Sequence, residues 1–531
     1  MKTPSVVLLL LGLAISTAHA QVSQEWVARY ASATPYSDVP YAMTVDAAGY
    51  IYVTGTTATS TGGNDWATIK YNSAGVQEWL RTQDGGGNDA AVAITTDQAG
   101  NVYVTGWSAG GLYFMTAKYS AAGDQLWVQF FTTIGEGDAG VDIALDHEGN
   151  VYVTGYNVET ATGLDIITIK YSPGGTELWV RRFDSANGED VPAAIACDAS
   201  GIYVTGRSGS SFTTIKYDFN GVEQWVRNYN GGYGSDAPAA LIADGAGNLY
   251  VTGQSTGDGT NHDYATIKYN AAGTQQWVSR YDGPTTVFAN DYDRAAALTV
   301  DADGNVFVTG NSADDFATVK YDAAGTEIWV RRYNGPAAGG DWATAIAVDA
   351  SGNSYVSGSS FGNSTTQYDF ATLSYDPSGT VRWTERYNGP GNNYDNAHSI
   401  AVHSSGSVYV SGSDGGGGTG LDYATIKYAP AATSVAPQPH QPRSTFALQS
   451  DPNPFTRASR IRFTIPETHR EHVRLAVYDV SGREVALLVN EVLSPGTYER
   501  ELNGSTFAAG VYWSRLQAGG HSEIGKLTLV R

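Results

Sequence analysis

Cysteine is nearly absent from this chain, and its absence removes several classes of chemistry. Cys197 is the only cysteine among 531 residues. A single cysteine excludes an internal disulfide, a Cys-x-x-Cys redox motif and a cysteine zinc cluster. Cys197 lies in the apolar run 193–198, as a buried thiol does.

Basic residues are also scarce, with 31 Lys and Arg against 53 Asp and Glu. The imbalance is confined to residues 21–442, which hold 19 basic and 44 acidic residues, whereas residues 443–531 hold 11 and 9. So acidic a body repels nucleic-acid phosphates and anionic membrane surfaces. We therefore expect no nucleic-acid partner.

Long apolar runs are missing after the first twenty residues. The chain opens with Lys2, an apolar stretch from Val6 to Ile15, and the small-residue pattern Ala-His-Ala at 18–20. This order is typical of a secretory signal peptide, predicted here as residues 1–20, with a mature chain that begins at Gln21. No later stretch approaches eighteen apolar residues, so we expect no transmembrane segment in the mature form.

Glycine, tyrosine and tryptophan are abundant instead, at 63, 34 and 12 residues, and they recur periodically. Tyr-Val-Thr-Gly or a close variant appears eight times, about 50 residues apart. The copies occupy 52–55, 103–106, 152–155, 203–206, 250–253, 307–310, 355–358 and 409–412. A motif like Ala-Thr-Ile-Lys-Tyr follows each copy, and seven of these lead into a glycine turn and a tryptophan.

Each unit reads as four short strands separated by turn residues, which is the size of a propeller blade. The sequence therefore predicts an all-β, eight-bladed β-propeller over residues 21–430. After Tyr428 no glycine turn or tryptophan follows, whereas an unpaired fourth strand opens the mature chain at 24–30. We expect that N-terminal strand to complete the eighth blade and so close the ring.

The tryptophans of the fourth strands are predicted to fill the space where neighbouring blades splay apart. These blade-packing residues are Trp26, Trp79, Trp127, Trp179, Trp225, Trp277, Trp329 and Trp383. The repeat units, such as residues 345–358, resemble the bacterial β-propeller repeat called SBBP. That resemblance covers about 410 residues and implies the fold without implying an activity.

The periodicity ends at a linker and a second domain. Four prolines lie between residues 429 and 444, which predicts an extended linker over 431–445. Alternating strands then fill 446–531: 459–465, 473–479, 484–490, 496–502, 511–518 and 522–530. Their number and spacing predict a small Ig-like β-sandwich.

This second domain opens with Pro452, Asn453, Pro454 and Phe455. It continues with the strand and turn at 477–485 and the motifs at 494–498 and 509–512. In this order the motifs resemble the type A sorting domain of the type IX secretion system. The resemblance implies a Bacteroidetes-like bacterium, type IX secretion machinery as a partner, and passage across the outer membrane. It also implies removal of the sorting domain, with the cargo released or attached to the cell surface.

One aspartate recurs at the start of every repeat: Asp38, Asp89, Asp138, Asp190, Asp236, Asp293, Asp341 and Asp395. One interpretation is an acidic ring at the mouth of the channel, able to hold Ca²⁺ or a cationic ligand. The other is that each carboxylate accepts backbone N–H groups in its own loop. The second is favoured because every repeat has the residue, whereas ligand sites are asymmetric.

Two further features lie on the same predicted face. A second set of aspartates precedes the third strands and reads as turn residues: Asp65, Asp165, Asp263, Asp315, Asp369 and Asp422. The loops between second and third strands vary most, and variable loops on a rigid scaffold are where recognition usually lies. Trp107, Tyr156 and Phe361 near them offer rings for stacking on sugars.

No catalytic constellation emerges from residue spacing. We expect a secreted or cell-surface, non-enzymatic binding module, monomeric, with an extracellular glycan or protein ligand. No cofactor is required, and a metal at the acidic ring stays an open question, with Ca²⁺ as the candidate. The alternatives are a quinoprotein-like dehydrogenase, because such enzymes also carry a tryptophan in each of eight blades, a carbohydrate-active propeller enzyme, and a structural spacer.

Overall fold

The structure is a computed structural model that describes residues 22–430 and 447–530, apart from short internal stretches. Those stretches are 35, 61–62, 133–136, 160–162, 186–187, 258–260, 285–291, 338, 364, 418–419, 452–454, 466–470, 481, 494–495, 506 and 519–520. The chain divides into two compact units, Met1–Ala432 and Thr433–Arg531. The predicted signal peptide and linker lie outside the described residues, as do Pro452, Asn453 and Pro454.

Strands between Val22 and Pro430 form four-stranded antiparallel sheets, eight of them among the described residues. We number them as repeat sheets in chain order. Sheets 1 to 4 are β2–β5 (Val39–Val45, Ile51–Ala58, Asn64–Tyr71, Gln77–Gln83), β6–β9 (Ala90–Thr96, Val102–Ser108, Tyr113–Tyr119, Gln125–Phe131), β10–β13 (Ala139–Leu145, Val151–Glu159, Gly163–Tyr171, Glu177–Phe183) and β14–β17 (Asp190–Asp198, Gly201–Ser208, Ser211–Tyr217, Glu223–Tyr229). Sheets 5 to 7 are β18–β21 (Ala237–Ala243, Leu249–Thr256, His262–Tyr269, Gln275–Tyr281), β22–β25 (Asp293–Val300, Val306–Ser312, Asp315–Tyr321, Glu327–Tyr333) and β26–β29 (Asp341–Val348, Ser354–Asn363, Gln367–Tyr375, Val381–Tyr387). Sheet 8 is β30 (Asn396–Val402), β31 (Val408–Gly415), β32 (Leu421–Pro430) and β1 (Val22–Tyr30).

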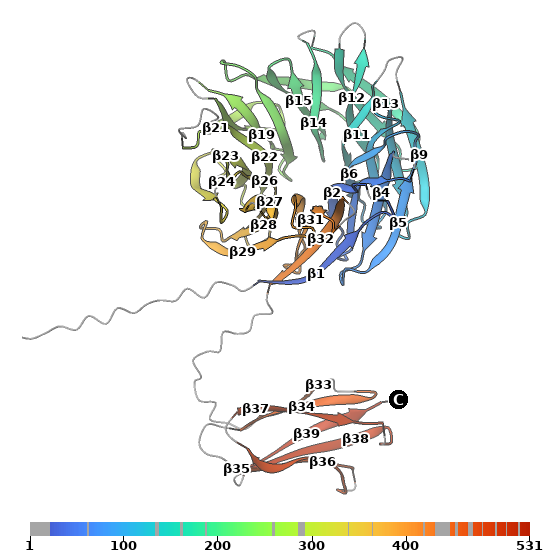
Figure 1. Ribbon diagram of the computed structural model, residues 1–531, viewed down its shortest axis with the longest axis vertical. Coiled ribbons are helices and arrows are strands. Elements are labelled where there is room, and N and C mark those ends of the chain that lie inside the picture. The colour runs from blue at the N-terminus through green and yellow to red at the C-terminus, as the bar shows by residue number, and fades with distance from the viewer. Residues whose placement is uncertain are drawn as a thin grey trace, which may run out of the picture. The chain divides into compact units, whose positions relative to one another are not determined.

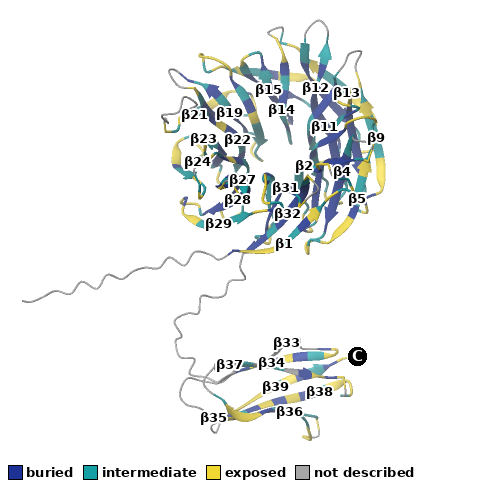
Figure 2. Cartoon of the chain, viewed as in Figure 1, coloured by how far each residue is buried: buried dark blue, intermediate teal, exposed yellow. Residues whose placement is uncertain are grey.

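The two middle strands of each sheet hold the core. β3, for example, is buried at every position, because neighbouring sheets cover both of its faces. Fourth strands such as β13 are more exposed. Figure 2 shows this burial falling from the middle strands toward the outer ones. Val-Tyr-Val runs form these middle strands because β-branched and aromatic side chains pack well on a pleated surface.

The N-terminal strand closes the series, as the sequence predicted. β1 pairs antiparallel with β32, with Gln24 opposite Tyr428 and Trp26 opposite Lys427. The first strands of successive sheets also contact one another in order, and β30 contacts β2. Figure 1 shows the sheets following one another around a ring. Because β1 pairs with β32, the strand edge at the seam of the ring is hydrogen-bonded rather than open.

Adjacent sheets are joined by a repeated pair of hydrogen bonds. In sheet 5, Lys268 and Trp277 are cross-strand partners, and both donate to the carbonyl of Ala323 in the next sheet's turn, at 3.2 Å each. Gly325 of that turn has φ +83°, and a Cβ there would lie 2.6 Å from the Trp277 ring. The pairing of a glycine turn with tryptophan is thus a contact between sheets.

The C-terminal unit consists of two sheets. One contains β33 (Ala447–Asp451), β34 (Ala458–Ile465) and β37 (Gly496–Asn503), and the other contains β35 (Glu471–Tyr478), β36 (Glu484–Leu493), β38 (Gly510–Ala518) and β39 (His521–Leu529). Both contribute to one core, with Phe463 and Leu502 from the first sheet and Leu475 and Leu516 from the second. Within each of these two sheets, neighbouring strands pair antiparallel. No described segment of the chain forms a helix that could cross a membrane.

Candidate functional site on the loop rim

One end of the repeat sheets carries the sequence-predicted site residues, and we call it the loop rim. It comprises the segments that join each fourth strand to the next first strand, and those that join second to third strands. Antiparallel pairing within each sheet brings both kinds of segment to the same end. The recurrent aspartates stand where the first strands leave this rim.

All eight recurrent aspartates are at most 1% exposed. At Asp89, one carboxylate oxygen accepts the N–H of Gly85 at 2.6 Å, and the other accepts that of Ala109 at 2.7 Å. Asp395 binds Gly389 and Gly415 in the same way, at 2.6 and 2.7 Å. Asp38, Asp236 and Asp341 repeat this double contact. Asp190 and Asp293 show the contact to the preceding loop.

In these five sheets the carboxylate thus ties the loop before its strand to the loop after the second strand. Burial raises the pKa of Asp89 and Asp341, and it raises the pKa of Asp395 to about 6, while the backbone N–H groups oppose the shift. Buried carboxylates with satisfied acceptors do not line an open mouth. This geometry supports the structural interpretation of the aspartates over the ligand-binding one.

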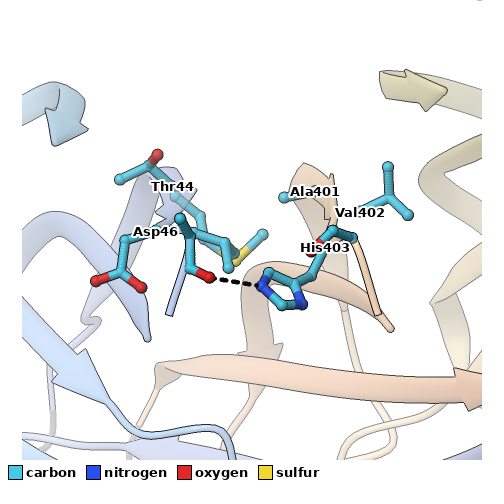
Figure 3. Close-up of a pocket in the computed structure, with 9 residues that line it drawn as sticks. Thr44, Asp46, Ala401, Val402 and His403 are labelled. Atoms are coloured by element: carbon cyan, nitrogen blue, oxygen red, sulfur yellow. Dashed lines mark hydrogen bonds between the residues drawn. The ribbon is translucent and has the colours of Figure 1, made fainter. Parts of the chain in front are cut away.

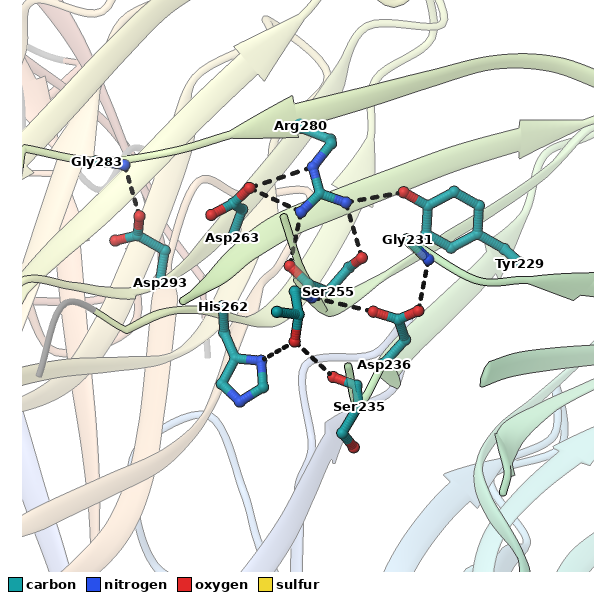
Figure 4. Close-up of polar contacts among 11 residues, drawn as sticks. Tyr229, Gly231, Ser235, Asp236, Ser255, His262, Asp263, Arg280, Gly283 and Asp293 are labelled. Atoms are coloured by element: carbon teal, nitrogen blue, oxygen red, sulfur yellow. Dashed lines mark hydrogen bonds and ion pairs between the residues drawn. The ribbon is translucent and has the colours of Figure 1, made fainter. Parts of the chain in front are cut away.

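A second rim network pairs the third-strand aspartates with arginines. The Arg280 guanidinium lies 2.7 Å from the carboxylate of Asp263, and it also donates to Ser255 Oγ at 2.7 Å and to Tyr229 Oη of the preceding sheet at 3.0 Å (Figure 4). The same pairing joins Arg332 to Asp315 and Arg386 to Asp369, at 2.9 and 2.7 Å. Arg182 pairs with Asp165.

In the sequence these aspartates have the pattern of turn residues, and their arginine partners were not predicted. The signal was available, because in all four pairs the arginine follows its aspartate by 17 residues. In sheet 8 the arginine is Arg29 of β1, which pairs with Asp414. The ion pairs therefore brace the rim from within.

Sheet 1 departs from this pattern because Thr82 occupies the arginine position opposite Ala67. Carboxylate oxygens of Asp65, Asp84 and Asp89 lie within 4.8 Å of one another. Burial and the charges of Asp84 and Asp89 raise the pKa of Asp65. Two other such trios contain Asp165 with Asp184 and Asp190, and Asp263 with Asp282 and Asp293. Arg182 and Arg280 contact those two trios, whereas the trio of sheet 1 has a threonine in that place.

Sheets 7 and 8 carry a group of stacked aromatic rings, which we call the aromatic stack: Trp342, Tyr368 and Tyr394. The Trp342 and Tyr368 centroids are 4.9 Å apart with planes at 25°, and those of Tyr368 and Tyr394 are 5.6 Å apart at 18°. Phe361 meets the edge of Tyr368 at 5.4 Å. Trp342 and Tyr394 remain 39% and 49% exposed. Large exposed rings gathered together are unusual enough to need an explanation.

The buried aspartates hold this stack in place. Trp342 follows Asp341, Tyr394 precedes Asp395, and Asp341 accepts the Phe361 N–H at 3.0 Å. The Asp395 N–H donates to the Tyr368 carbonyl at 2.8 Å. A Cβ at Gly340 would lie 2.6 Å from the Trp342 ring, and one at Gly339 would lie 2.4 Å from Phe361. Backbone hydrogen bonds and two glycines thus leave room for the rings.

Of the aromatic residues that the sequence singled out, Phe361 lies against this stack. Trp107 and Tyr156 are half-buried in sheets 2 and 3, and the Trp107 carbonyl accepts the indole N–H of Trp66 at 2.9 Å. Trp342, Tyr368 and Tyr394 were not recognised. The repeat itself carried the signal, because the seven residues equivalent to Trp342 are Val39, Ala90, Ala139, Val191, Ala237, Arg294 and Asn396.

A pocket of about 340 Å³ lies at the seam between sheets 1 and 8, at the end opposite the rim (Figure 3). His403 stands there in the turn between β30 and β31, at the position that Asp46 occupies between β2 and β3, and its Nε2 lies 3.2 Å from the Ala47 carbonyl. The Asp46 carboxylate is engaged by the N–H groups of Ala48 and Tyr50 and by the Tyr52 hydroxyl. The lining therefore joins the two sheets and offers little reactive chemistry.

Comparison with known proteins supports the identification of both domains. Residues 25–60 match the beta-propeller repeat of the SBBP type, and residues 452–530 match the secretion system C-terminal sorting domain. Among curated proteins, none matches this chain.

Three solved structures that are similar to this chain share low sequence identity with it. A protein from Lactobacillus plantarum has 15% identity and a TM-score of 0.43, covering 64% of this chain and 96% of its own. The WD40 domain of SCAP from fission yeast has 7% identity and a TM-score of 0.43, with coverage of 76% and 97%. A fungal alcohol oxidase of the AA5 family, in complex with copper, has 13% identity and a TM-score of 0.41, with coverage of 96% and 100%. The chain thus carries an SBBP-type β-propeller repeat and, at its C-terminal end, a sorting domain of the type IX secretion system.

Proposed function

We propose that this protein is a secreted or surface-attached binding module without enzymatic activity, built as an eight-bladed β-propeller followed by an Ig-like sorting domain. The eight four-stranded sheets, the β1–β32 pairing and the two-sheet C-terminal unit support this architecture. The proposed binding partner is an extracellular glycan or protein. The sorting domain points to secretion and an outer-surface location.

The observation that carries the proposal is the contrast between a repeated scaffold and a local exception. Buried aspartates recur in every repeat sheet and hold the rim loops together. Stacked aromatic rings with two exposed members, by contrast, gather in sheets 7 and 8, whereas the stacked rim pair His262 and Tyr292 is half-buried. A rigid ring that presents one unlike surface is the arrangement expected of a recognition site.

The enzyme alternatives draw less support from the same geometry. The rim carboxylates of Asp89, Asp236, Asp341 and Asp395 each accept two backbone N–H groups, and the Arg–Asp pairs neutralise one another. A quinoprotein or a glycosidase needs carboxylates available to a metal or a substrate. We expect no cofactor, and Ca²⁺ remains the ion to test at the acidic trio of sheet 1.

Export is the second part of the proposal. The signal peptide would carry the chain across the inner membrane, leaving Gln21 as the first residue, and the sorting domain would engage the type IX machinery. Removing residues 446–531 is expected to hold the propeller inside the cell envelope. Cell fractionation of a secreting host, with the full chain as the control, tests this step.

The binding proposal is tested with the purified full chain on an array of extracellular glycans and proteins. We expect at least one specific ligand. Dye reduction with added pyrroloquinoline quinone and Ca²⁺, or release of reducing sugar from polysaccharides, would instead show an enzyme. An array with no bound ligand would favour a structural spacer.

A further inference from the structure

The aromatic stack in sheets 7 and 8 has the shape and polarity of a carbohydrate subsite. We propose that Trp342, Tyr368 and Tyr394 bind a neutral sugar ring of an extracellular polysaccharide. This inference rests on the proposed binding function and names its ligand class.

The stack is built rather than accidental. Its three members come from separate strands and loops, 26 residues apart in each step, yet the planes of Trp342 and Tyr394 lie at only 25° and 18° to that of Tyr368. Trp342 and Tyr368 are the second residues of β26 and β28, and Tyr394 lies two residues before β30. The Asp341 and Asp395 contacts that fix these three sites are the ones repeated around the ring. The rings are therefore held in position before a ligand arrives, which lowers the entropic cost of binding.

Exposure of the stack leaves ring surface for a partner. Tyr394 is 49% exposed and Trp342 39%, although each already stacks on Tyr368. Sugar rings present flat patches of C–H groups, which pack against an aromatic face, while their hydroxyls need donors and acceptors around it. Ligand sites combine such aromatic surface with a few polar groups.

The loops around the stack supply neutral polar groups. Residues 359–363 and 365–368 contain no charged residue, and Asn363 and Thr365 among them are exposed. Residues 388–394 contain three asparagines and no charged residue, and Asn392 and Asn393 are exposed. Asp341, Asp369 and Asp395, the carboxylates next to the three rings in the sequence, are buried. Amide and hydroxyl groups match the hydroxyls of a neutral sugar better than they match an ion.

Charge near the stack argues against an anionic ligand. Asp314 of sheet 6 is exposed, and its carbonyl accepts the N–H of Asp341 at 2.7 Å. Its charge adds to burial, Tyr394 and Asp341 in raising the pKa of Tyr368. A carboxylate in this position accepts sugar hydroxyls and repels uronates and sulfated sugars. A cationic ligand, held by cation–π contacts, is the competing occupant that the experiment separates.

The test is calorimetric titration of the full chain with hexasaccharides of β-1,4-glucose, β-1,3-glucose, β-1,4-xylose, β-1,4-mannose and α-1,4-glucose. Oligogalacturonate and chitosan oligomers serve as anionic and cationic probes. We expect a neutral hexasaccharide to bind and to change the tryptophan fluorescence. Trp342→Ala and Tyr394→Ala should each weaken its affinity tenfold or more, and Trp342→Phe should weaken it less.

Tyr233→Ala is the matched control, since Tyr233 is a rim tyrosine that is 59% exposed and lies in the segment between β17 and β18. It should leave the affinity within twofold, and thermal melting should show all variants folded. The subsite would be overturned if Trp342→Ala and Tyr394→Ala bound the hexasaccharide as tightly as the natural protein does. It would also be overturned if chitosan or oligogalacturonate bound more tightly than every neutral hexasaccharide. If no neutral sugar binds while the array yields a protein ligand, the subsite falls and the binding function stands. If neither assay yields a ligand, both fall.

Discussion

The ammonium group of Lys427 lies 3.2 Å from the carbonyl oxygen of Ser73, although 354 residues separate them. The same carbonyl accepts the indole N–H of Trp26 at 3.1 Å. These two contacts join sheet 8 to sheet 1. They are of the same kind as the lysine and tryptophan hydrogen bonds that join sheet 5 to sheet 6. The seam is therefore chemically equivalent to the junction between sheets 5 and 6.

Deleting residues 22–30 tests the importance of this seam. Without β1, the edge of β32 loses its hydrogen-bonding partner and Trp26 leaves the junction, so we expect a lower melting temperature and aggregation. Thermal melting and light scattering would measure both effects. A chain that ends at residue 432 but keeps β1 is the control and should remain monomeric. Unchanged melting without β1 would contradict the closure argument.

Trp277→Ala tests the packing between sheets 5 and 6. The indole lies against Gly325 and donates to Ala323. Losing the ring is expected to cost about 3 kcal/mol of unfolding free energy. Denaturant unfolding measures this, with Trp342→Ala as the control for an exposed tryptophan, expected to change stability by under about 0.5 kcal/mol. Equal effects of the two substitutions would be evidence against the junction role.

Asp236→Ala separates a structural aspartate from a ligand-binding one. The substitution leaves the N–H groups of Gly231 and Thr256 without their acceptor, at a cost of about 2 to 4 kcal/mol. Asp236→Asn keeps one acceptor oxygen and should cost less. We expect ligand affinity to stay within twofold wherever the variant is folded. A large loss of affinity with unchanged stability would restore the acidic ring as a binding site.

Thr82→Arg supplies the guanidinium that sheet 1 lacks. Placed as Arg280 is in sheet 5, it would neutralise Asp65, and we expect about 1 kcal/mol of added stability. The same substitution in an Asp65→Asn background should give no gain, which completes a double-mutant cycle. If Ca²⁺ stabilises the natural protein and Thr82→Arg removes that effect, the trio holds an ion rather than a strained cluster of charges.

His398→Gln tests a pH-dependent contribution to stability. Burial lowers the pKa of His398 to about 4, from an unfolded value near 6.5. Because the pKa of His398 is depressed in the folded state, the contribution of His398 to the unfolding free energy is complete above pH 6.5. That contribution is lost as the pH falls toward 4, by about 2 kcal/mol at pH 5. Asp395, whose pKa is raised to about 6, shifts stability in the opposite direction. The natural protein should therefore lose more stability than His398→Gln between pH 8 and pH 5.

Much of the architecture could be predicted from the sequence, because it repeats. Tyr-Val-Thr-Gly or a close variant recurs eight times, and every copy lies in the second strand of its sheet. The unpaired strand around Trp26 and the missing tryptophan after Tyr428 together predicted the seam. In the C-terminal unit the predicted strands match β34 to β39, but β33 was missed, because Ala447–Asp451 is too short for its alternation to be recognised.

The tertiary structure decided which residues meet on the rim. Trp342, Tyr368 and Tyr394 each read as a loop or strand-end residue. Their rings meet because sheet 7 places β26 and β28 at the same rim and the segment from β29 to β30 brings Tyr394 against Tyr368. The partners of Arg280 and the burial of the recurrent aspartates were likewise decided by packing. A repeat determines what every sheet has in common, whereas a site depends on distances between sheets, which the order of residues along one chain does not contain.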